Sequence, residues 1–183
     1  MTCNLSLEGE VVAVASSVEH EFRKRIKQAI TLVEGHGAEG DVHAGLPIQH
    51  RYLAKTVPVL PNNRQVHLIS SELLADLRSS GFTVIPGDLG ENVTTANLNL
   101  THLPLGTRLL IGQAAVVELT GLRTPCSLID RFQKGLKRAM INRNGNPRFK
   151  SGVFGIVRAT GEIAPGNAVI VQLPSTWEAL PAL

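Results

Sequence analysis

The sequence predicts a mainly β protein with a few peripheral helices. Its 17 glycines and 10 prolines separate short runs of β-branched residues, a pattern that is typical of many strands joined by turns. Two segments have the apolar spacing of helices instead. A length of 183 residues suits one sizeable core and is too short for two ordinary domains. We therefore expect one domain over residues 1–183, with a core at about 9–173 and a tail at 174–183.

Seven runs of the sequence fit strands. Residues 114–120 do not alternate between polar and apolar side chains, so we expect a central strand there, covered on both faces. A turn rich in glycine and proline at 161–167 leads into the last strand, which closes the sheet. The expected strands are 9–15, 29–33, 65–69, 108–111, 114–120, 152–159 and 167–173.

The two helices are indicated by caps and apolar stripes. The first is expected over residues 70–78, where two serines and an acid open the first turn and leucines share one face. The second is expected to begin with Thr124 as N-cap and Pro125 at the first helical position, and to end at 142–147. Gly135 weakens it by about 1 kcal/mol relative to alanine. Its apolar face consists of Leu128, Ile129, Phe132, Leu136 and Met140.

The composition is that of a folded, soluble protein, with 43% hydrophobic and 18% charged residues. No run approaches the ~18 apolar residues of a membrane-spanning helix, and the first residues lack the basic start of a secretion signal. We expect a cytoplasmic protein without a membrane partner. In that reducing compartment Cys3 and Cys126 are expected to be free thiols, and Cys3 to be incidental.

Positive charge is concentrated in one segment. The net charge is +3, but residues 122–158 carry nine Lys and Arg against one acid, Asp130, and are therefore +8. The rest of the chain has nine bases against fourteen acids and is −5. The segment predicts an anionic partner.

Cys126 lies within this segment, just after the expected start of the second helix. Helix N-termini and nearby Lys or Arg lower a cysteine pKa from about 8.5 toward the range ~3.5–7.5. Arg123 stands three residues before the cysteine. The alternative interpretation is a small buried apolar side chain. We interpret Cys126 as a reactive or metal-binding thiol.

Two glycine-rich acidic loops are further candidates. Residues 39–45 combine Asp41, His43 and two glycines, which suits close approach to a ligand or a simple surface turn. His36 and His43 have no recognised zinc-ligand spacing with Cys126.

The second loop, residues 86–95, places two glycines around an acid. Such a backbone can bind an anion through successive N–H groups. Its polar side chains could bond to a heterocycle or to each other; they are Asp88, Glu91, Asn92 and Thr94. Neither the phosphate-loop motif nor the dinucleotide fingerprint is present, which argues against a nucleoside-triphosphate enzyme.

Several motifs in register resemble the MOSC domain, the C-terminal domain of molybdenum cofactor sulfurase, which also occurs as stand-alone bacterial proteins. The motifs cover most of the chain, from about residue 9 to 173. They are Gly40-Asp41-Val42-His43-Ala44-Gly45, Arg64-Gln65-Val66-His67-Leu68-Ile69, Gly87-Asp88-Leu89-Gly90-Glu91-Asn92-Val93-Thr94, Leu103-Pro104-Leu105-Gly106-Thr107, Ile111-Gly112, Thr120-Gly121-Leu122-Arg123-Thr124-Pro125-Cys126 and Gly152-Val153-Phe154-Gly155. This chain has Gly166-Asn167 where members often have Gly-Asp near the last turn, which we interpret as a turn substitution.

The resemblance implies a closed or partly open β-barrel and a molybdenum cofactor (molybdopterin) bound at Cys126, which would ligate the metal or carry a persulfide. Cys126, Asp88 and Glu91 are then the candidate catalytic residues. The anionic pterin would be bound by the phosphate-gripping Arg123, Arg148 and Lys150 together with other loop residues. The full set of candidate cofactor-binding residues is Asp41, His43, Arg64, Gly87, Asn92, Thr94, Arg123, Arg148 and Lys150. The resemblance implies no pyridoxal phosphate in this chain, because 183 residues are too few to hold both a MOSC domain and the sulfurase domain that binds pyridoxal phosphate.

Three functions remain open from the sequence. The first is a protein that binds molybdenum cofactor and acts as a small oxidoreductase on N-hydroxylated compounds, as relatives in this family do. Its partner would be an electron-transfer protein. The second is a persulfide carrier that receives sulfur at Cys126 from a cysteine desulfurase. The third is a basic module for nucleic acid, which the scarcity of aromatic residues around 131–150 makes the least favoured.

Overall fold

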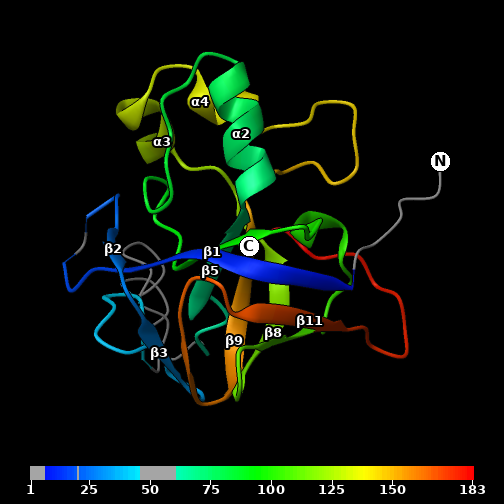
Figure 1. Cartoon of the computed structure of the whole chain (residues 1–183). Helices are drawn as coiled ribbons and strands as arrows, with labels where there is room; N and C mark the ends of the chain where they lie inside the picture. Colours follow the sequence, from blue (N-terminus) through cyan, green and yellow to red (C-terminus); the bar gives the residue numbers. More distant parts are fainter. Residues whose placement is uncertain (1–6, 20, 46–60) are drawn as a thin grey trace.

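The computed structural model describes residues 7–19, 21–45 and 61–183 and shows a β-barrel with short helices gathered at one end (Figure 1). Cys3 lies outside the described residues, so the prediction made for it stays untested. The strands are β1 (Glu8–Ser16), β2 (Arg25–Lys27), β3 (Ile30–Val33), β4 (Gly37–Ala38), β5 (Val66–Ser70), β6 (Val93–Ala96), β7 (Arg108–Ile111), β8 (Ala115–Leu122), β9 (Val153–Ala159), β10 (Gly161–Ile163) and β11 (Ala168–Gln172).

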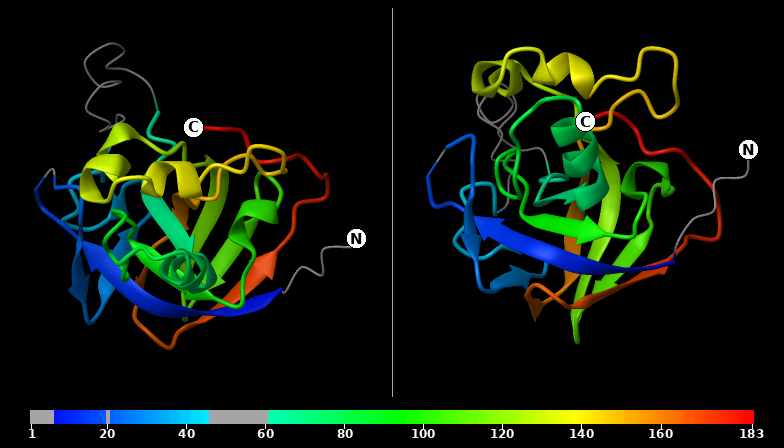
Figure 2. Two further views of the ribbon diagram at one scale, coloured as in Figure 1. Left: turned by 90° about the horizontal axis from the view of Figure 1, so that it is seen from above. Right: turned by 45° about the horizontal axis from the view of Figure 1, so that its top comes forward.

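Seven of the described strands close the barrel in the order β11-β7-β8-β9-β5-β6-β1, and β2 adds to β1. The closing pair is β1 with β11, where Gly9 lies opposite Val169 (Figure 2). All neighbours in this sheet are antiparallel except β5 and β6. Closure leaves no strand edge of the barrel itself unpaired. The predicted barrel is therefore confirmed, with β10, β3 and β4 forming a separate small sheet.

Strand β8 is central, between β7 and β9, as predicted. The expectation that both of its faces are covered is wrong. Its burial alternates: Ala115, Val117 and Leu119 are buried in the barrel interior, and the side chains between them are half-exposed. The interior of the barrel is filled from one face of each strand, and the other face of β8 is only partly covered.

The first helix, α2 (Ser71–Ser79), begins as predicted. Ser70 is its N-cap, and the Ser70 side chain accepts a hydrogen bond from the Leu73 backbone N–H at 3.2 Å. Leu74 and Leu77 are buried on its inner face. None of the helices in the described part of the chain is long and apolar enough to cross a bilayer.

The second predicted helix is wrong in its start and its continuity. It divides into α3 (Ser127–Phe132) and α4 (Leu136–Ala139), because Gly135 takes a left-handed conformation with φ of 88°. The N-cap is Cys126 rather than Thr124. Residues before Cys126 stay extended because the Thr124 N–H donates to the Leu183 carbonyl, which continues the pairing of β8.

Two apolar cores follow from this arrangement. The larger fills the barrel, and the smaller lies between the helices and the barrel end. Residues of the smaller core are Ile69, Leu74, Leu77, Val84, Leu89, Ile129, Leu136 and Met140. Cys126 packs against this smaller core and is partly buried. The thiol is therefore placed where the helical layer meets the open end of the barrel.

Candidate functional site

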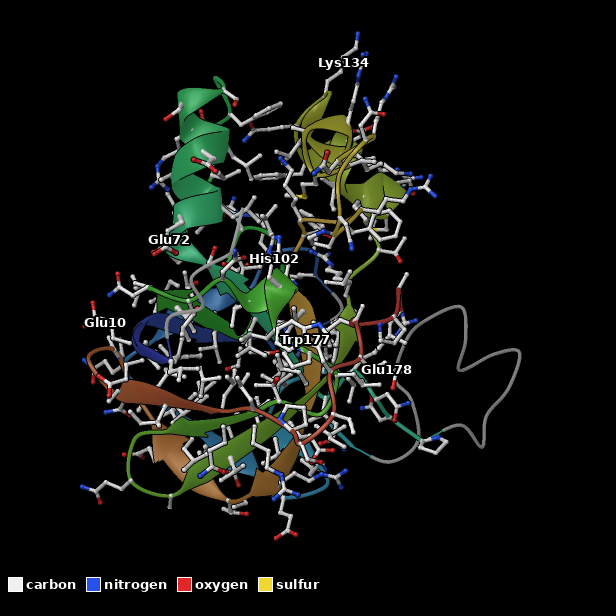
Figure 3. The ribbon with its side chains drawn as sticks, turned by 90° about the vertical axis from the view of Figure 1, so that its right-hand side faces the viewer. Glu10, Glu72, His102, Lys134, Trp177 and Glu178 are labelled. Carbon is white, nitrogen blue, oxygen red and sulfur yellow. The ribbon has the colours of Figure 1, made fainter. Side chains whose placement is uncertain are left out.

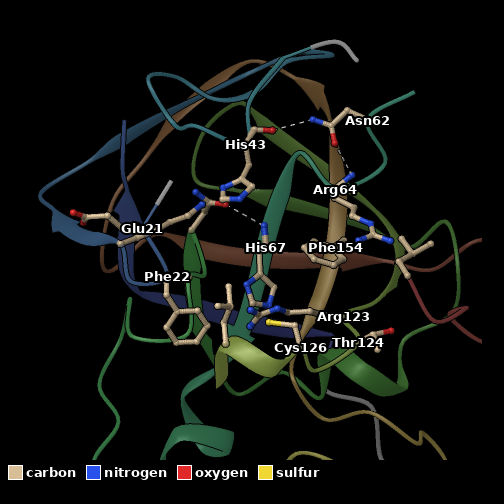
Figure 4. Close-up of a pocket in the computed structure, with 15 residues that line it drawn as sticks. Glu21, Phe22, His43, Asn62, Arg64, His67, Arg123, Thr124, Cys126 and Phe154 are labelled. Atoms are coloured by element: carbon tan, nitrogen blue, oxygen red, sulfur yellow. Dashed lines mark hydrogen bonds between the residues drawn. The ribbon is translucent and has the colours of Figure 1, made fainter. Parts of the chain in front are cut away.

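A cavity of about 170 Å³ lies at this end of the barrel (Figure 4). Its walls come from segments far apart in the sequence, which the barrel brings together. Cys126 and Arg123 lie at one end and Arg64 lies toward the other, with the neighbouring rings of His67 and Phe154 between them. The remaining lining residues are Glu21, Lys24, His43, Asn62, Gly90, Asn92, Thr124, Leu128 and Leu183.

Cys126 is the only cysteine of the described residues and a free thiol that lines the cavity. It precedes α3 instead of standing inside its first turn, and α3 has only six residues. The prediction that a helix N-terminus activates the thiol therefore loses its main support. Its positive neighbour remains, because Arg123 lines the same cavity.

Two arginines supply positive charge to the cavity. Burial lowers the pKa of Arg123, and the negative charges of Cys126 and Glu91 oppose that shift. The Arg123 Nη1 donates to the Leu89 carbonyl oxygen at 2.8 Å. The Arg64 guanidinium lies 5.5 Å from the centre of the Phe154 ring, and burial lowers its pKa. Among the described residues, no carboxylate lies within 4.0 Å of either guanidinium, so the cavity offers two cations to an anion.

A third cation, Lys24, was not predicted. Its ammonium bonds both Asp41 carboxylate oxygens, at 2.8 and 2.9 Å, and both side chains are almost wholly buried. Burial lowers the pKa of Lys24, and Asp41 opposes this. Burial also raises the pKa of Asp41, but hydrogen bonds from His43 and the charge of Lys24 outweigh it and hold that carboxyl well below its usual range. The pair is therefore ionised at neutral pH.

Asp41 anchors this wall of the cavity. Besides Lys24, it accepts hydrogen bonds from the Ser17 N–H at 3.2 Å, the His43 N–H at 3.0 Å and the Asn92 amide at 3.1 Å. His43 itself is half-exposed, lines the cavity, and has its Nδ1 3.3 Å from Asp41. Asp41 thus positions three lining residues, Lys24, His43 and Asn92, and is not a lining residue itself.

His67 is a second lining residue that was not singled out from the sequence. Its Nε2 lies 2.9 Å from the Ser151 carbonyl oxygen, so the neutral ring donates from this nitrogen. Its backbone N–H donates to Asn92. Burial and the charge of Arg123 lower the pKa of His67 well below its ordinary value, so the ring is neutral at pH 7. The sequence could have indicated His67 as a site residue, because it lies on an expected strand three residues after the candidate Arg64.

The loop 86–94 satisfies its own polar groups. The Glu91 carboxylate accepts hydrogen bonds from the Gly87 N–H at 2.6 Å and the Leu89 N–H at 3.2 Å, and the Thr94 hydroxyl donates to it at 3.3 Å. Burial raises the pKa of Glu91. Glu91 and Thr94 bond within the loop, whereas Asp88 and Asn92 bond residues outside it. The backbone nest holds the Glu91 carboxylate, not an external anion.

Asp88 is also engaged inside the protein. It accepts from the Ile85 N–H at 3.1 Å and forms an ion pair with Arg23 at 2.7 Å. Neither Asp88 nor Glu91 lines the cavity. The loop contributes to the cavity through Asn92, Gly90 and the Leu89 carbonyl oxygen that accepts from Arg123. Gly87 lies where a Cβ would come within 2.6 Å of the Lys24 carbonyl oxygen.

Arg148 and Lys150 do not join this site. Both are exposed, and Arg148 lies over the ring of its neighbour Phe149 at 5.6 Å. Lys150 lines a second hollow, of about 490 Å³, between α2 and the loop before β9. The structure therefore brings Cys126, His43, Arg64, Asn92 and Arg123 to one cavity and places these two cations elsewhere.

The C-terminal tail, for which no structure or role was predicted, closes one wall of the cavity. Leu183 lines the cavity, its N–H donates to the Leu122 carbonyl oxygen at 2.9 Å, and its side chain fills the space above Gly121. A Cβ on Gly121 would lie 2.5 Å from Leu183, so the glycine allows this contact. Near the last turn, the Asn167 side chain accepts from the Ala164 N–H at 2.9 Å, which is the role of a turn residue.

The fold and the site define a class of protein: a small β-barrel with one thiol and two arginines in a cavity at its helical end. The chain belongs to the MOSC domain family, whose pattern it matches over residues 38–170. No curated protein sequence matches it.

Solved structures show the same fold. YuaD from Bacillus subtilis aligns with a TM-score of 0.77 at 19% identity, covering 92% of this chain and 97% of that one. YiiM from Escherichia coli aligns with a TM-score of 0.64 at 19% identity, covering 95% of this chain and 74% of that one. YiiM from Geobacillus stearothermophilus aligns with a TM-score of 0.61 at 18% identity, covering 96% and 79%. These likenesses concern the fold.

Proposed function

We propose that this protein binds a molybdenum cofactor in the Cys126 cavity, with the thiolate as a metal ligand. The observation that carries the proposal is the combination, in one cavity, of a free thiol with two guanidinium groups that have no carboxylate partner among the described residues. A phosphorylated pterin with a soft metal needs those two kinds of group.

The residues present fit such a group. Among the described residues, no three His, Cys, Asp or Glu side chains cluster to hold a metal ion. A metal that brings most of its ligands with it, as a metal in an organic cofactor does, suits this single thiol. When bound, the group would supply a redox centre. The chain's own residues bind and orient it: Cys126 at the metal, Arg123 and Arg64 at anionic oxygens, and neutral His67 as a hydrogen-bonding wall.

The experiment compares two cysteine variants. Wild type, Cys126→Ser and Cys3→Ser are purified from a host that makes molybdenum cofactor, and metal content and oxidised-pterin fluorescence are measured. Wild type and Cys3→Ser should carry both at equal stoichiometry, and Cys126→Ser should lose both. Stoichiometric molybdenum in Cys126→Ser would overturn the proposal. A single added sulfur atom on wild-type Cys126 with no metal would favour persulfide carriage instead.

A further inference from the structure

Most of the positive charge of segment 122–158 is not used by the cavity. Apart from Arg158, which is exposed but pairs with Glu118, six of its nine Lys and Arg side chains are exposed, and none of the six lines the cavity. Among the described residues, no carboxylate lies within 4.0 Å of any of them. Asp130, the one acid of the segment, bonds the Lys137 backbone N–H at 2.9 Å. The exposed cations are Arg131, Lys134, Arg138, Arg143, Arg148 and Lys150.

A groove leaves the cavity at its thiol end. Glu21, Phe22 and Leu128 line both the cavity and the groove, so the two lie side by side. The groove then passes over Phe132 and alongside Arg131 on α3. Leu128 is 42% exposed, whereas Phe22 and Phe132, which line the same groove, are partly buried against the smaller core. An exposed leucine beside a functional cavity, with aromatic neighbours, is typical of a binding surface.

The aromatic rings of Phe22 and Phe132, which form the floor of the groove, are held in place by contacts with their neighbours. The Phe22 and Phe132 rings pack at 5.7 Å between centres. Arg23 lies over the Phe132 ring at 5.6 Å and is fixed by its ion pair with Asp88 at 2.7 Å. A preorganised apolar floor loses little conformational entropy when a partner covers it.

We propose that this groove and the exposed cations of α3 and α4 form the docking surface for an acidic protein. Figure 3 shows Lys134, between α3 and α4, projecting away from the barrel, where it faces an approaching partner. The cations attract the partner at long range, and Leu128 and the groove floor supply the short-range contact. Docking there brings the partner beside Cys126. Only the partner's task, exchange of electrons or sulfur with the cavity, rests on the proposed function.

The contacts favour a protein over a nucleic acid. Single-stranded nucleic acid binds by stacking its bases on free aromatic faces. In segment 131–150 both aromatic rings are already covered by arginines: Phe132 by Arg23 and Phe149 by Arg148. A protein interface instead combines arginine, partly buried aromatic rings and a central aliphatic side chain, as here.

The test uses three fluorescent probes on the metal-free protein. They are a peptide of glutamate and leucine, an all-glutamate peptide of the same length, and a single-stranded oligonucleotide of equal charge. Fluorescence anisotropy should show the glutamate–leucine peptide binding tightest, and that peptide should slow alkylation of Cys126 by iodoacetamide. Tighter binding of the oligonucleotide would overturn the proposal in favour of a nucleic-acid surface.

Matched variants locate the surface. Leu128→Ser should weaken the glutamate–leucine peptide about tenfold, and Leu173→Ser, at the same 42% exposure beyond β11, should not. Arg131→Glu should weaken both peptides, and Lys27→Glu on β2 should not. Equal effects within either pair would refute the proposed location. Cys126→Ser should bind the peptide like wild type, so a failure of cofactor binding and a failure of docking remain distinguishable.

Discussion

The Arg123 guanidinium donates a hydrogen bond to the Leu89 carbonyl oxygen at 2.8 Å. This bond joins the chain segment just before Cys126 to the loop 86–94. The Leu89 N–H in turn donates to Glu91. Glu91, although outside the cavity, therefore acts on the site by positioning Arg123. Its role is that of a support for the site.

We expect Glu91→Gln to lower both stability and cofactor content. A glutamine side chain offers one oxygen where the carboxylate offers two, so either the Gly87 or the Leu89 N–H loses its acceptor. A buried donor left without a partner costs about 1–3 kcal/mol. Urea unfolding and metal analysis measure the two effects. The control is Glu118→Gln, whose carboxylate pairs with Arg108 and Arg158 on the exterior and should cost no more than about 1 kcal/mol. Equal losses would contradict the supporting role.

Removing either cavity arginine should weaken anion binding. Arg64→Gln and Arg123→Gln are each expected to reduce the affinity for inorganic phosphate about tenfold, because each removes a charge-assisted hydrogen bond. Isothermal titration calorimetry on the metal-free protein measures this directly. Arg158→Gln, which is exposed and paired with Glu118, serves as the control and should leave the affinity unchanged. Phosphate affinity equal to wild type in both cavity variants would show that the anion binds elsewhere.

The Lys24–Asp41 pair should respond unequally to loss of its two members. Asp41→Asn leaves the Lys24 ammonium buried without a counter-charge, which costs about 3–5 kcal/mol. Lys24→Met should cost less, since the Asp41 carboxylate keeps its three hydrogen bonds from Ser17, His43 and Asn92. The double variant should be less unstable than the sum of the single ones. Additive losses by urea unfolding would show that the two groups are not coupled.

His67 makes stability depend on pH. Its folded-state pKa lies well below 6.5, so below about pH 6.5 the unfolded chain takes up a proton that the folded protein does not. Stability should therefore fall as the pH drops from 7 to 5, by up to about 1.4 kcal/mol per pH unit from this group. His67→Gln should flatten that slope in thermal unfolding, while His102→Gln, on a half-exposed histidine, should keep it. An unchanged slope in His67→Gln would contradict the buried neutral state.

Gly152 should be intolerant of a side chain. Its φ is 93°, and a Cβ there would crowd the Leu68 carbonyl and lie 2.9 Å from the His67 Nε2. Gly166 has a φ of 87° but open space around it, so Gly166→Ala costs only the left-handed backbone, about 1–2 kcal/mol. Gly152→Ala should cost more than this and should lower cofactor content by displacing His67. Equal changes in melting temperature would refute the steric account.

The main strands were predictable because turn residues bound them, but β2, β4, β6 and β10 were not. These strands have two to four residues, too few to show the alternation of polar and apolar side chains that marks a strand. In addition, β6 follows a loop whose polar residues are typical of a ligand-binding loop. The helix break at Gly135 was foreseen only as a weakness. Its left-handed φ depends on how α3 and α4 pack, which local propensity does not contain.

The site was predictable where chemistry marks the residue, and missed where tertiary packing does. Cys126 was indicated by its thiol and Arg123 by its charge beside that thiol, and both line the cavity. Lys24 lies between two exposed arginines in sequence and resembles a solvated basic run, yet it is the buried one. Arg148 and Lys150 were grouped with the cavity by charge alone, because the direction in which a loop leaves the barrel is set by contacts distant in sequence.

The pairing of β1 with β11 determines when the cavity can exist. On the side where the barrel closes, Glu8–Glu10 pair with residues 168–170, so a nascent chain cannot close its barrel before those residues have been synthesised. Contacts of such long sequence separation form slowly. The cavity beside Cys126 can therefore be complete only after residues 168–170 have been synthesised and have paired with β1.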